Sequence, residues 1–139
     1  MIREHDELTR AVLAVYGGRE IKTLGDGFMA SFSSARRSVD AAIDLQQRLA
    51  QRHGVPIDVR IGIEAGEPIE EDGDLFGATV IRASRISALA GAGEVLVSDT
   101  IRSLCSGKDV SFVDRGATAL KGFDEPTRIA AVDWRSVAR

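Results

Sequence analysis

One short stretch of the chain has the spacing of a nucleotide-binding motif. Residues 25–30 read Gly-Asp-Gly-Phe-Met-Ala, which matches the GxGxxA pattern of dinucleotide sites. In those sites a helix follows the glycines, and its N-terminus holds the pyrophosphate. Here Phe28, Ala30 and Phe32 alternate with other residues, which predicts a strand instead. We therefore expect no dinucleotide site of this kind, and the sequence contains no GxxxxGK(S/T) phosphate loop.

Five charged side chains are further candidates for chemistry, and each also has an ordinary structural explanation. Lys22 and Asp26 are four residues apart at a predicted hairpin, and residues four apart in a strand share a face unless the turn intervenes. Asp26 stands between two glycines, which is also typical of a turn residue. Arg82 and Arg85 lie three apart on one side of a predicted helix, where solvated arginines are common. Lys121 lies in a polar loop.

Histidine and cysteine usage excludes two other kinds of site. His5 and His53 are far apart and have no histidine or cysteine at ligand spacing, so we expect surface histidines and no zinc site. Cys105 is the single cysteine, so no internal disulfide can form. The first residues contain no apolar signal region. These features predict a cytoplasmic, reducing location.

The N-terminal half predicts two helices around a hairpin. Leu8, Val12 and Val15 have the spacing of one apolar helical stripe, which Gly17-Gly18 ends. Residues 21–24 and 28–32 predict two strands joined by a glycine-containing turn with Asp26 at its tip. Ser33 or Ser34 is expected to cap a second helix that ends before Gly54. Its predicted core positions are Val39, Ala42, Ile43 and Leu49.

The C-terminal half predicts a mixture of strands and helices. Residues 57–63 alternate strictly between apolar and other residues, so we expect a strand with one face in the core. The acidic stretch 70–74 predicts a loop, and Asp99 is expected to cap a short helix that runs through Cys105. The other expected elements are a helix over 78–89 and strands over 95–97, 112–113 and 129–132. Together these elements predict one α+β domain over residues 1–139, with a largely antiparallel sheet and helices on one side.

Composition limits the classes of partner. The chain has 139 residues, which is about one domain, and its 18 basic against 21 acidic residues give a net charge of −3. A weakly acidic protein does not neutralise many phosphates of a nucleic acid, so we expect no such partner. No apolar run approaches the roughly 18 residues that a membrane helix needs. The sequence therefore predicts a domain without a membrane segment.

The order and spacing of these separate signals resemble the catalytic domain of class III adenylate and guanylate cyclases. The resemblance covers nearly the whole chain and implies the ferredoxin-like α+β fold of that family. Its most specific part is the stretch Lys22–Ala30. The other matching stretches are Gly62–Gly66, Asp74–Gly77 leading into Ala83–Arg85, Arg115-Gly116 and Leu120–Gly122.

The resemblance implies a reaction and a cofactor. Family members convert a nucleoside triphosphate to the 3′,5′-cyclic monophosphate and pyrophosphate, with two Mg²⁺ or Mn²⁺ ions held by a pair of aspartates. Asp26 matches one aspartate of that pair, and a carboxylate suits such hard cations. Arg85 matches the arginine that stabilises charge on the transferred phosphorus, and Lys121 matches a lysine that contacts the triphosphate.

The same resemblance implies a substrate and an assembly. Lys22 and Asp74 match the two positions that read the base. A lysine can donate to N1 of adenine and an aspartate can accept from its N6 amine, whereas guanine presents the opposite pattern. ATP is therefore expected over GTP, with cyclic AMP as the product. Family sites form between two subunits, Asp26 of one facing Lys22, Asp74 and Arg85 of the other, so we expect a homodimer.

The sequence departs from the family pattern at two places. Ile81 stands where the family has an asparagine donor, and losing one such donor costs about a hundredfold in rate. The family's first strand, which carries the other metal aspartate, is missing from this chain, so the resemblance makes it N-terminally truncated. That strand lies in the middle of the family's sheet. We therefore expect that strand 28–32 pairs directly with a neighbour, that another chain supplies the strand, or that the polypeptide begins upstream.

Two other functions compete with an adenylate cyclase for intracellular signalling. Ile81 and the missing aspartate favour a cyclase-like domain without activity that regulates or dimerises. Retention of Lys22, Asp26, Asp74 and Arg85 favours the enzyme. A ferredoxin-like RNA-binding module needs exposed aromatics and a basic face, which 5% aromatic residues and a charge of −3 do not supply.

Overall fold

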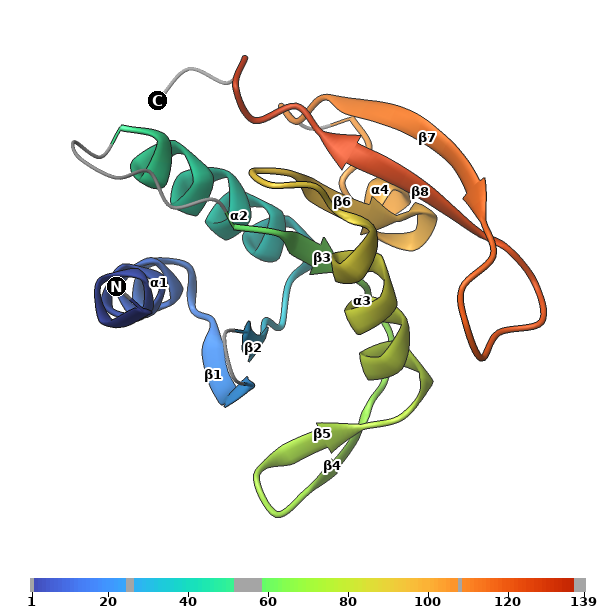
Figure 1. The fold of residues 1–139 in the computed structure, drawn as a ribbon, viewed down its shortest axis with the longest axis horizontal. Coiled ribbons are helices and arrows are strands. Elements are labelled where there is room, and N and C mark those ends of the chain that lie inside the picture. The colour runs from blue at the N-terminus through green and yellow to red at the C-terminus, as the bar shows by residue number, and fades with distance from the viewer. Residues whose placement is uncertain (1, 25–26, 52–58, 108, 137–139) are drawn as a thin grey trace.

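The computed structural model describes residues 2–24, 27–51, 59–107 and 109–136 as an α+β fold of four helices and eight strands (Figure 1). The predicted fold class is confirmed by this arrangement. Within the described residues no helix has the length and apolar character needed to cross a membrane. The elements in chain order are α1 (Ile2–Tyr16), β1 (Arg19–Leu24), β2 (Gly27–Ser31), α2 (Ala35–Ala50), β3 (Ile61–Ile63), β4 (Ile69–Glu71), β5 (Asp74–Phe76), α3 (Ala78–Leu89), β6 (Val95–Ser98), α4 (Asp99–Leu104), β7 (Phe112–Thr118) and β8 (Thr127–Val132).

The first helix and the hairpin form as the sequence predicts, with one change in the buried stripe. β1 and β2 pair in antiparallel register, and the turn residues 25–26 lie outside the described residues. On α1, Val12 is buried in a cluster with Leu8 and Tyr16, which gives a stripe at intervals of four residues. Val15 is 59% exposed, so its predicted place in the stripe is wrong. The stripe follows the side of α1 that faces α2.

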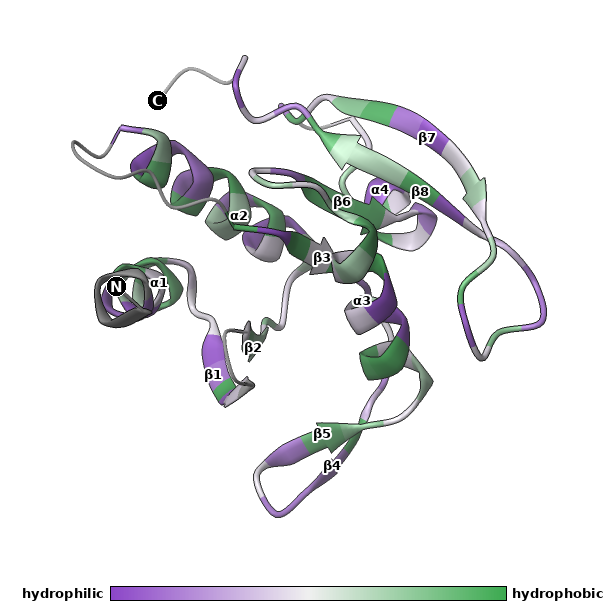
Figure 2. Ribbon diagram, viewed as in Figure 1, coloured by the Kyte–Doolittle hydropathy of each residue, from purple (hydrophilic) through white to green (hydrophobic). Residues whose placement is uncertain are grey.

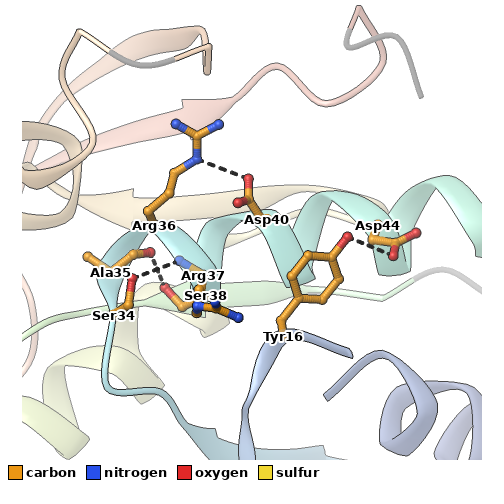
Figure 3. Close-up of polar contacts among 8 residues, drawn as sticks. All are labelled: Tyr16, Ser34, Ala35, Arg36, Arg37, Ser38, Asp40 and Asp44. Atoms are coloured by element: carbon orange, nitrogen blue, oxygen red, sulfur yellow. Dashed lines mark hydrogen bonds and ion pairs between the residues drawn. The ribbon is translucent and has the colours of Figure 1, made fainter. Parts of the chain in front are cut away.

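Helix α2 begins at a side-chain cap and is tied to α1 (Figure 3). The Ser34 hydroxyl accepts a hydrogen bond from the Arg37 backbone N–H at 3.2 Å, which selects Ser34 from the two predicted caps. The Tyr16 hydroxyl donates to Asp44 at 2.9 Å. All four predicted core positions of this helix are buried. The helix ends at Ala50, and the predicted stop at Gly54 lies outside the described residues.

The main sheet has the strand order β3-β6-β8-β7, with β3 parallel to β6 and the other pairs antiparallel. Its central strand β6 is fully buried and apolar up to Ser98 (Figure 2). Val95 and Val97 pack with residues of α2 and α4 on one face of the sheet. Leu96 between them packs with Ile86 and Ala90, at the C-terminal end of α3 and just beyond it.

Two further local predictions are wrong. The acidic stretch predicted as a loop forms the β4–β5 hairpin, because Asp72 and Gly73 take φ values of 52° and 77°. Positive φ at both turn residues is the geometry that closes a two-residue hairpin. Helix α4 is capped by Ser98, whose hydroxyl accepts from the Ile101 N–H at 3.3 Å, and not by Asp99.

The hairpin β1–β2 forms a sheet separate from the main one among the described residues. The expected direct pairing of strand 28–32 with a neighbouring strand of the main sheet is therefore not found, since β2 pairs with β1. Supply of a strand by another chain and an upstream start of the polypeptide are not tested by this structure.

Strand β3 is packed on both faces. The predicted strand 57–63 is described only from residue 59 and is regular over Ile61–Ile63. Ile61 and Ile63 pack against the core cluster of α2 and β6. A Cβ on Gly62 would lie 2.7 Å from Ser87 Cα and 2.8 Å from the Ala83 carbonyl oxygen, so the backbone of α3 lies directly on the other face. Glycine is therefore required at position 62 by space rather than by a turn.

We expect Gly62→Ala to lower the free energy of unfolding by about 1–3 kcal/mol, because helix backbone would have to move to admit the methyl group. The measurement is urea unfolding followed by fluorescence of the single tryptophan, which is buried. Gly91→Ala is the matched control, since its Cβ meets only the flexible Glu94 side chain, 3.3 Å away at its nearest atom. Equal unfolding midpoints for the two variants would contradict close packing at Gly62.

Candidate functional site

The structure joins Lys22 and Asp74, which are 52 residues apart in the sequence. Lys22 Nζ lies 2.7 Å from Asp74 Oδ2, and both side chains are about one-third exposed. Lys22 comes from β1 and Asp74 opens β5, so the ion pair links the two hairpins. The Lys22 ammonium also lies 5.9 Å from the centre of the Phe76 ring, a cation–π distance.

Hydrogen bonds hold the Asp74 carboxylate in its charged form. The Lys22 ammonium lowers the pKa of Asp74, and the Leu75 backbone N–H, which donates to Oδ1 at 2.7 Å, lowers it further. Partial burial acts in the opposite direction and is outweighed. A cation donor and an anionic acceptor therefore lie side by side at a partly exposed position, where a planar polar ligand edge could reach both.

A second group of predicted residues meets at the loop between β7 and β8. Arg85 Nε donates to the Lys121 backbone carbonyl at 3.2 Å. Lys121 and Gly122 are the central residues of a β-turn, because the Phe123 N–H donates to the Leu120 carbonyl at 3.0 Å and Gly122 has a φ of +91°. Buried Leu120 fixes the start of this turn in the cluster with Ile86. Lys121 itself is exposed.

Arg82 contacts the same turn and is not the solvated residue that its spacing suggests. Its guanidinium carbon lies 4.5 Å from the centre of the Phe123 ring, and Nη1 lies 3.3 Å from Glu64 Oε2. Arg82 and Arg85 therefore share one side of α3, as their spacing predicts, and that side faces the β7–β8 loop.

Glu64 is a residue of this region to which sequence reasoning assigned no role. Its side chain is 3% exposed. Oε1 accepts from the Ala65 N–H at 2.9 Å and from the Ser98 hydroxyl, and Oε2 accepts from Arg82. Alternation in strand 57–63 indicated a polar face, which the structure covers with α3. Glu64 is identified as a buried carboxylate only by its contacts with Ser98 and Arg82, which lie 34 and 18 residues away in the sequence.

The predicted site residues thus form two pairs, Lys22 with Asp74 and Arg85 with the Lys121 turn. Among the described residues no hydrogen bond or ion pair joins one pair to the other. The predicted metal ligand Asp26 lies outside the described residues. No group of three or more His, Cys, Asp or Glu in the described part of the chain could hold a metal ion. Ile81, one helical turn before Arg85, is 46% exposed.

Comparison with known proteins gives consistent matches. The sequence profile described as the adenylate and guanylate cyclase catalytic domain matches residues 1–131. A protein of Rhizobium meliloti (strain 1021), provisionally named adenylate cyclase 3, is 37% identical over 129 residues. That match covers 88% of this chain and 22% of the relative, so the chain spans about a fifth of the length of that protein.

Solved structures agree with the sequence matches. The adenylate/guanylate cyclase/hydrolase from Silicibacter pomeroyi is 32% identical with a TM-score of 0.83, covering 91% of this chain and 77% of that one. The adenylyl cyclase CyaB from P. aeruginosa is 25% identical with a TM-score of 0.81, covering 99% of this chain and 81% of that one.

The Lys22–Asp74 pair predicts a measurable titration. We expect the pKa of Asp74 to lie below the ordinary aspartate value of about 3.9 and to rise toward it in Lys22→Met. Because the folded-state pKa is depressed, the pair stabilises the fold above the unfolded pKa, and this contribution is lost as the pH falls through the folded pKa. Carboxyl NMR titration measures the shift.

Arg19→Met is the control for that titration, since Arg19 pairs with Glu70 across the same two hairpins at 3.3 Å without touching Asp74. It should leave the pKa of Asp74 unchanged. An Asp74 pKa that is the same with and without Lys22 would contradict the pair.

Proposed function

The chain belongs to the adenylate and guanylate cyclase catalytic domain family, and from this premise we propose that it is an adenylate cyclase. In the proposed reaction the ribose 3′-oxygen of ATP forms a bond to the α-phosphorus while the bond from that phosphorus to the leaving phosphate breaks. The products are 3′,5′-cyclic AMP and pyrophosphate, and the proton of the 3′-hydroxyl is released. Membership of the family supports a nucleotide cyclase, and the choice of ATP depends on the site.

The observation that carries this choice is the Lys22–Asp74 ion pair at 2.7 Å. Adenine presents an acceptor at N1 beside a donor at N6, and the pair presents a donor beside an acceptor. The ammonium has three N–H groups, so it can bind N1 while it keeps its contact with Asp74. Guanine offers N1–H and O6 at these positions, which would place donor against donor and acceptor against acceptor.

Arg85 and Lys121 are proposed to act on the phosphates. The Arg85 guanidinium is planar and permanently charged, and Nε already donates to the Lys121 carbonyl, which fixes its direction. Its remaining N–H groups can stabilise negative charge that develops on the transferred phosphorus. Lys121 projects from the neighbouring turn and is proposed to bind the triphosphate as a point charge.

Two divalent cations, Mg²⁺ or Mn²⁺, and a homodimer are part of the proposal. When bound, such cations lower the pKa of the attacking hydroxyl and neutralise the leaving phosphates. The only ligand proposed for them in this chain is Asp26, which the structure does not describe, so the roles above are derived without a metal step. The dimer is proposed because Asp26 of one subunit would face Lys22, Asp74 and Arg85 of the other.

A catalytically inactive, regulatory or dimerising cyclase-like domain is the second candidate. Ile81 favours it, because an exposed isoleucine one turn before Arg85 supplies no hydrogen bond where the family has an asparagine. The pairing of Lys22 with Asp74 favours the enzyme, since a domain with only a structural role gains little from a partly exposed ion pair.

Substitution of the two residues proposed to read the base tests the preference for ATP over GTP. We expect Lys22→Glu combined with Asp74→Cys to lower the ratio of kcat/KM for ATP to that for GTP by about a hundredfold, since each mispaired group costs about 1–3 kcal/mol. Product formation from each nucleotide with Mn²⁺ measures this ratio. Arg19→Glu with Glu70→Cys exchanges the neighbouring pair that joins the same hairpins and should preserve the ratio. An unchanged ratio in the first variant would refute base reading by Lys22 and Asp74.

Restoring a donor on α3 tests the second candidate. Ile81→Asn is expected to raise kcat by about tenfold or more, because the exposed side chain lies on the same side of α3 as Arg85 and the amide can donate to the phosphate. Ile81→Ala, which removes the isoleucine and adds no donor, should not raise it. If neither the parent chain nor Ile81→Asn forms a cyclic nucleotide, the inactive domain is the better account.

A further inference from the structure

Glu64 is a buried charge whose hydrogen bonds join three elements around the candidate site. A carboxylate that is 3% exposed must be paired, because burial of an isolated charge is costly. The Ala65 N–H, the Ser98 hydroxyl and the Arg82 guanidinium supply three donors. Glu64 thereby links the end of β3 to the cap of α4 and to α3, and neither Lys22 nor Asp74 takes part.

Arg82 carries this link to the β7–β8 loop. One side of the guanidinium group is held by Glu64 at 3.3 Å, and the group lies over the Phe123 ring at 4.5 Å. A guanidinium held in place by a carboxylate packs on an aromatic ring in a defined orientation, which a flexible lysine does not reproduce. Phe123 closes the turn in which Lys121 and Gly122 are the central residues.

The turn 120–123 is therefore attached to its surroundings at three points. Leu120 is buried in the core cluster, the Lys121 carbonyl accepts from Arg85, and Phe123 lies under Arg82. The Arg85 bond is exposed, and a single exposed hydrogen bond contributes little to holding a loop. The Arg82 contact depends on a buried carboxylate and is the stronger restraint at the C-terminal side of the turn.

We propose that Glu64 is a positioning residue for the triphosphate: by holding Arg82 against Phe123, it fixes the turn from which Lys121 binds the phosphates. The role of Lys121 in this inference rests on the proposed function. The restraint on the turn does not, because it follows from contacts within the chain. The two parts can therefore be tested separately.

Hydrogen exchange of the turn tests the restraint without nucleotide. The Phe123 amide, which donates to the Leu120 carbonyl, should exchange about tenfold faster in Glu64→Gln than in the parent chain. Arg82→Lys keeps a charge beside Glu64 but loses the planar group over Phe123, so it should raise the exchange rate of the Phe123 amide by the same factor. This variant replaces Glu64→Gln in the test if Glu64→Gln does not fold. Glu94→Gln is the matched control, because Glu94 also accepts from an arginine and a backbone N–H, but its arginine is Arg115 of β7 and not a residue of α3.

A double-mutant cycle tests the link to the phosphates. The probe is the ATP analogue with a methylene group between the α- and β-phosphorus atoms, titrated with Mn²⁺. Glu64→Gln should weaken its binding about tenfold, whereas Glu94→Gln should change it less than about twofold. In a Lys121→Ala background Glu64→Gln should have no further effect, because the turn then carries no lysine to position.

The outcomes separate the two proposals. Unchanged exchange at Phe123 in both Glu64→Gln and Arg82→Lys overturns the restraint. A second outcome is that Phe123 exchanges faster, but Glu64→Gln weakens binding of the analogue equally in the parent chain and in Lys121→Ala. This result overturns the positioning role, since Glu64 then acts through general stability and not through Lys121. If the parent chain does not bind the analogue, the proposed function fails together with the triphosphate role of Glu64, and the exchange result still decides the restraint.

Discussion

The close contact between α3 and β3 is the constraint on which the rest of the site depends. At Gly62 the helix backbone lies so near the strand that no Cβ fits, and at Gly66 a Cβ would meet the Thr79 hydroxyl. The buried Glu64 lies between these glycines and pairs with Arg82 of the same helix. Helix α3 is thus fixed along its length by two contacts that need glycine and by one partly buried ion pair.

The candidate site is built outward from this fixed helix. Asp74 lies on β5, a few residues before α3 begins, and receives Lys22 from the β1–β2 hairpin. Arg82 and Arg85, on one side of α3, contact the turn that presents Lys121. Asp74 of the pair proposed to read the base therefore lies just before α3, whereas Arg82 and Arg85, which contact the turn proposed to bind the phosphates, lie on α3 itself.

The sequence predicts best where the physical signal is local. Helix α2 follows from its cap at Ser34 and its apolar spacing, and the β1–β2 hairpin follows from alternation around a glycine turn. The β4–β5 hairpin is not evident from the sequence, because its acidic residues mask the Asp72-Gly73 turn. The apolar character of Val15 likewise does not decide its burial, since the side chain is exposed. Pairs that are distant in the sequence, such as Glu64 with Ser98, have no periodic signature. Only the family resemblance connects Lys22 with Asp74, which are 52 residues apart in the sequence.

In the proposed function this cyclase-family chain selects adenine through a lysine and an aspartate held 2.7 Å apart. The most direct test is a competition assay on the parent chain, with ATP and GTP present at equal concentrations with Mn²⁺ and both cyclic products quantified. Adenine selection predicts mainly cyclic AMP, by about tenfold or more. An excess of cyclic GMP would contradict the reading of the base, and the absence of both products would contradict the enzymatic function itself.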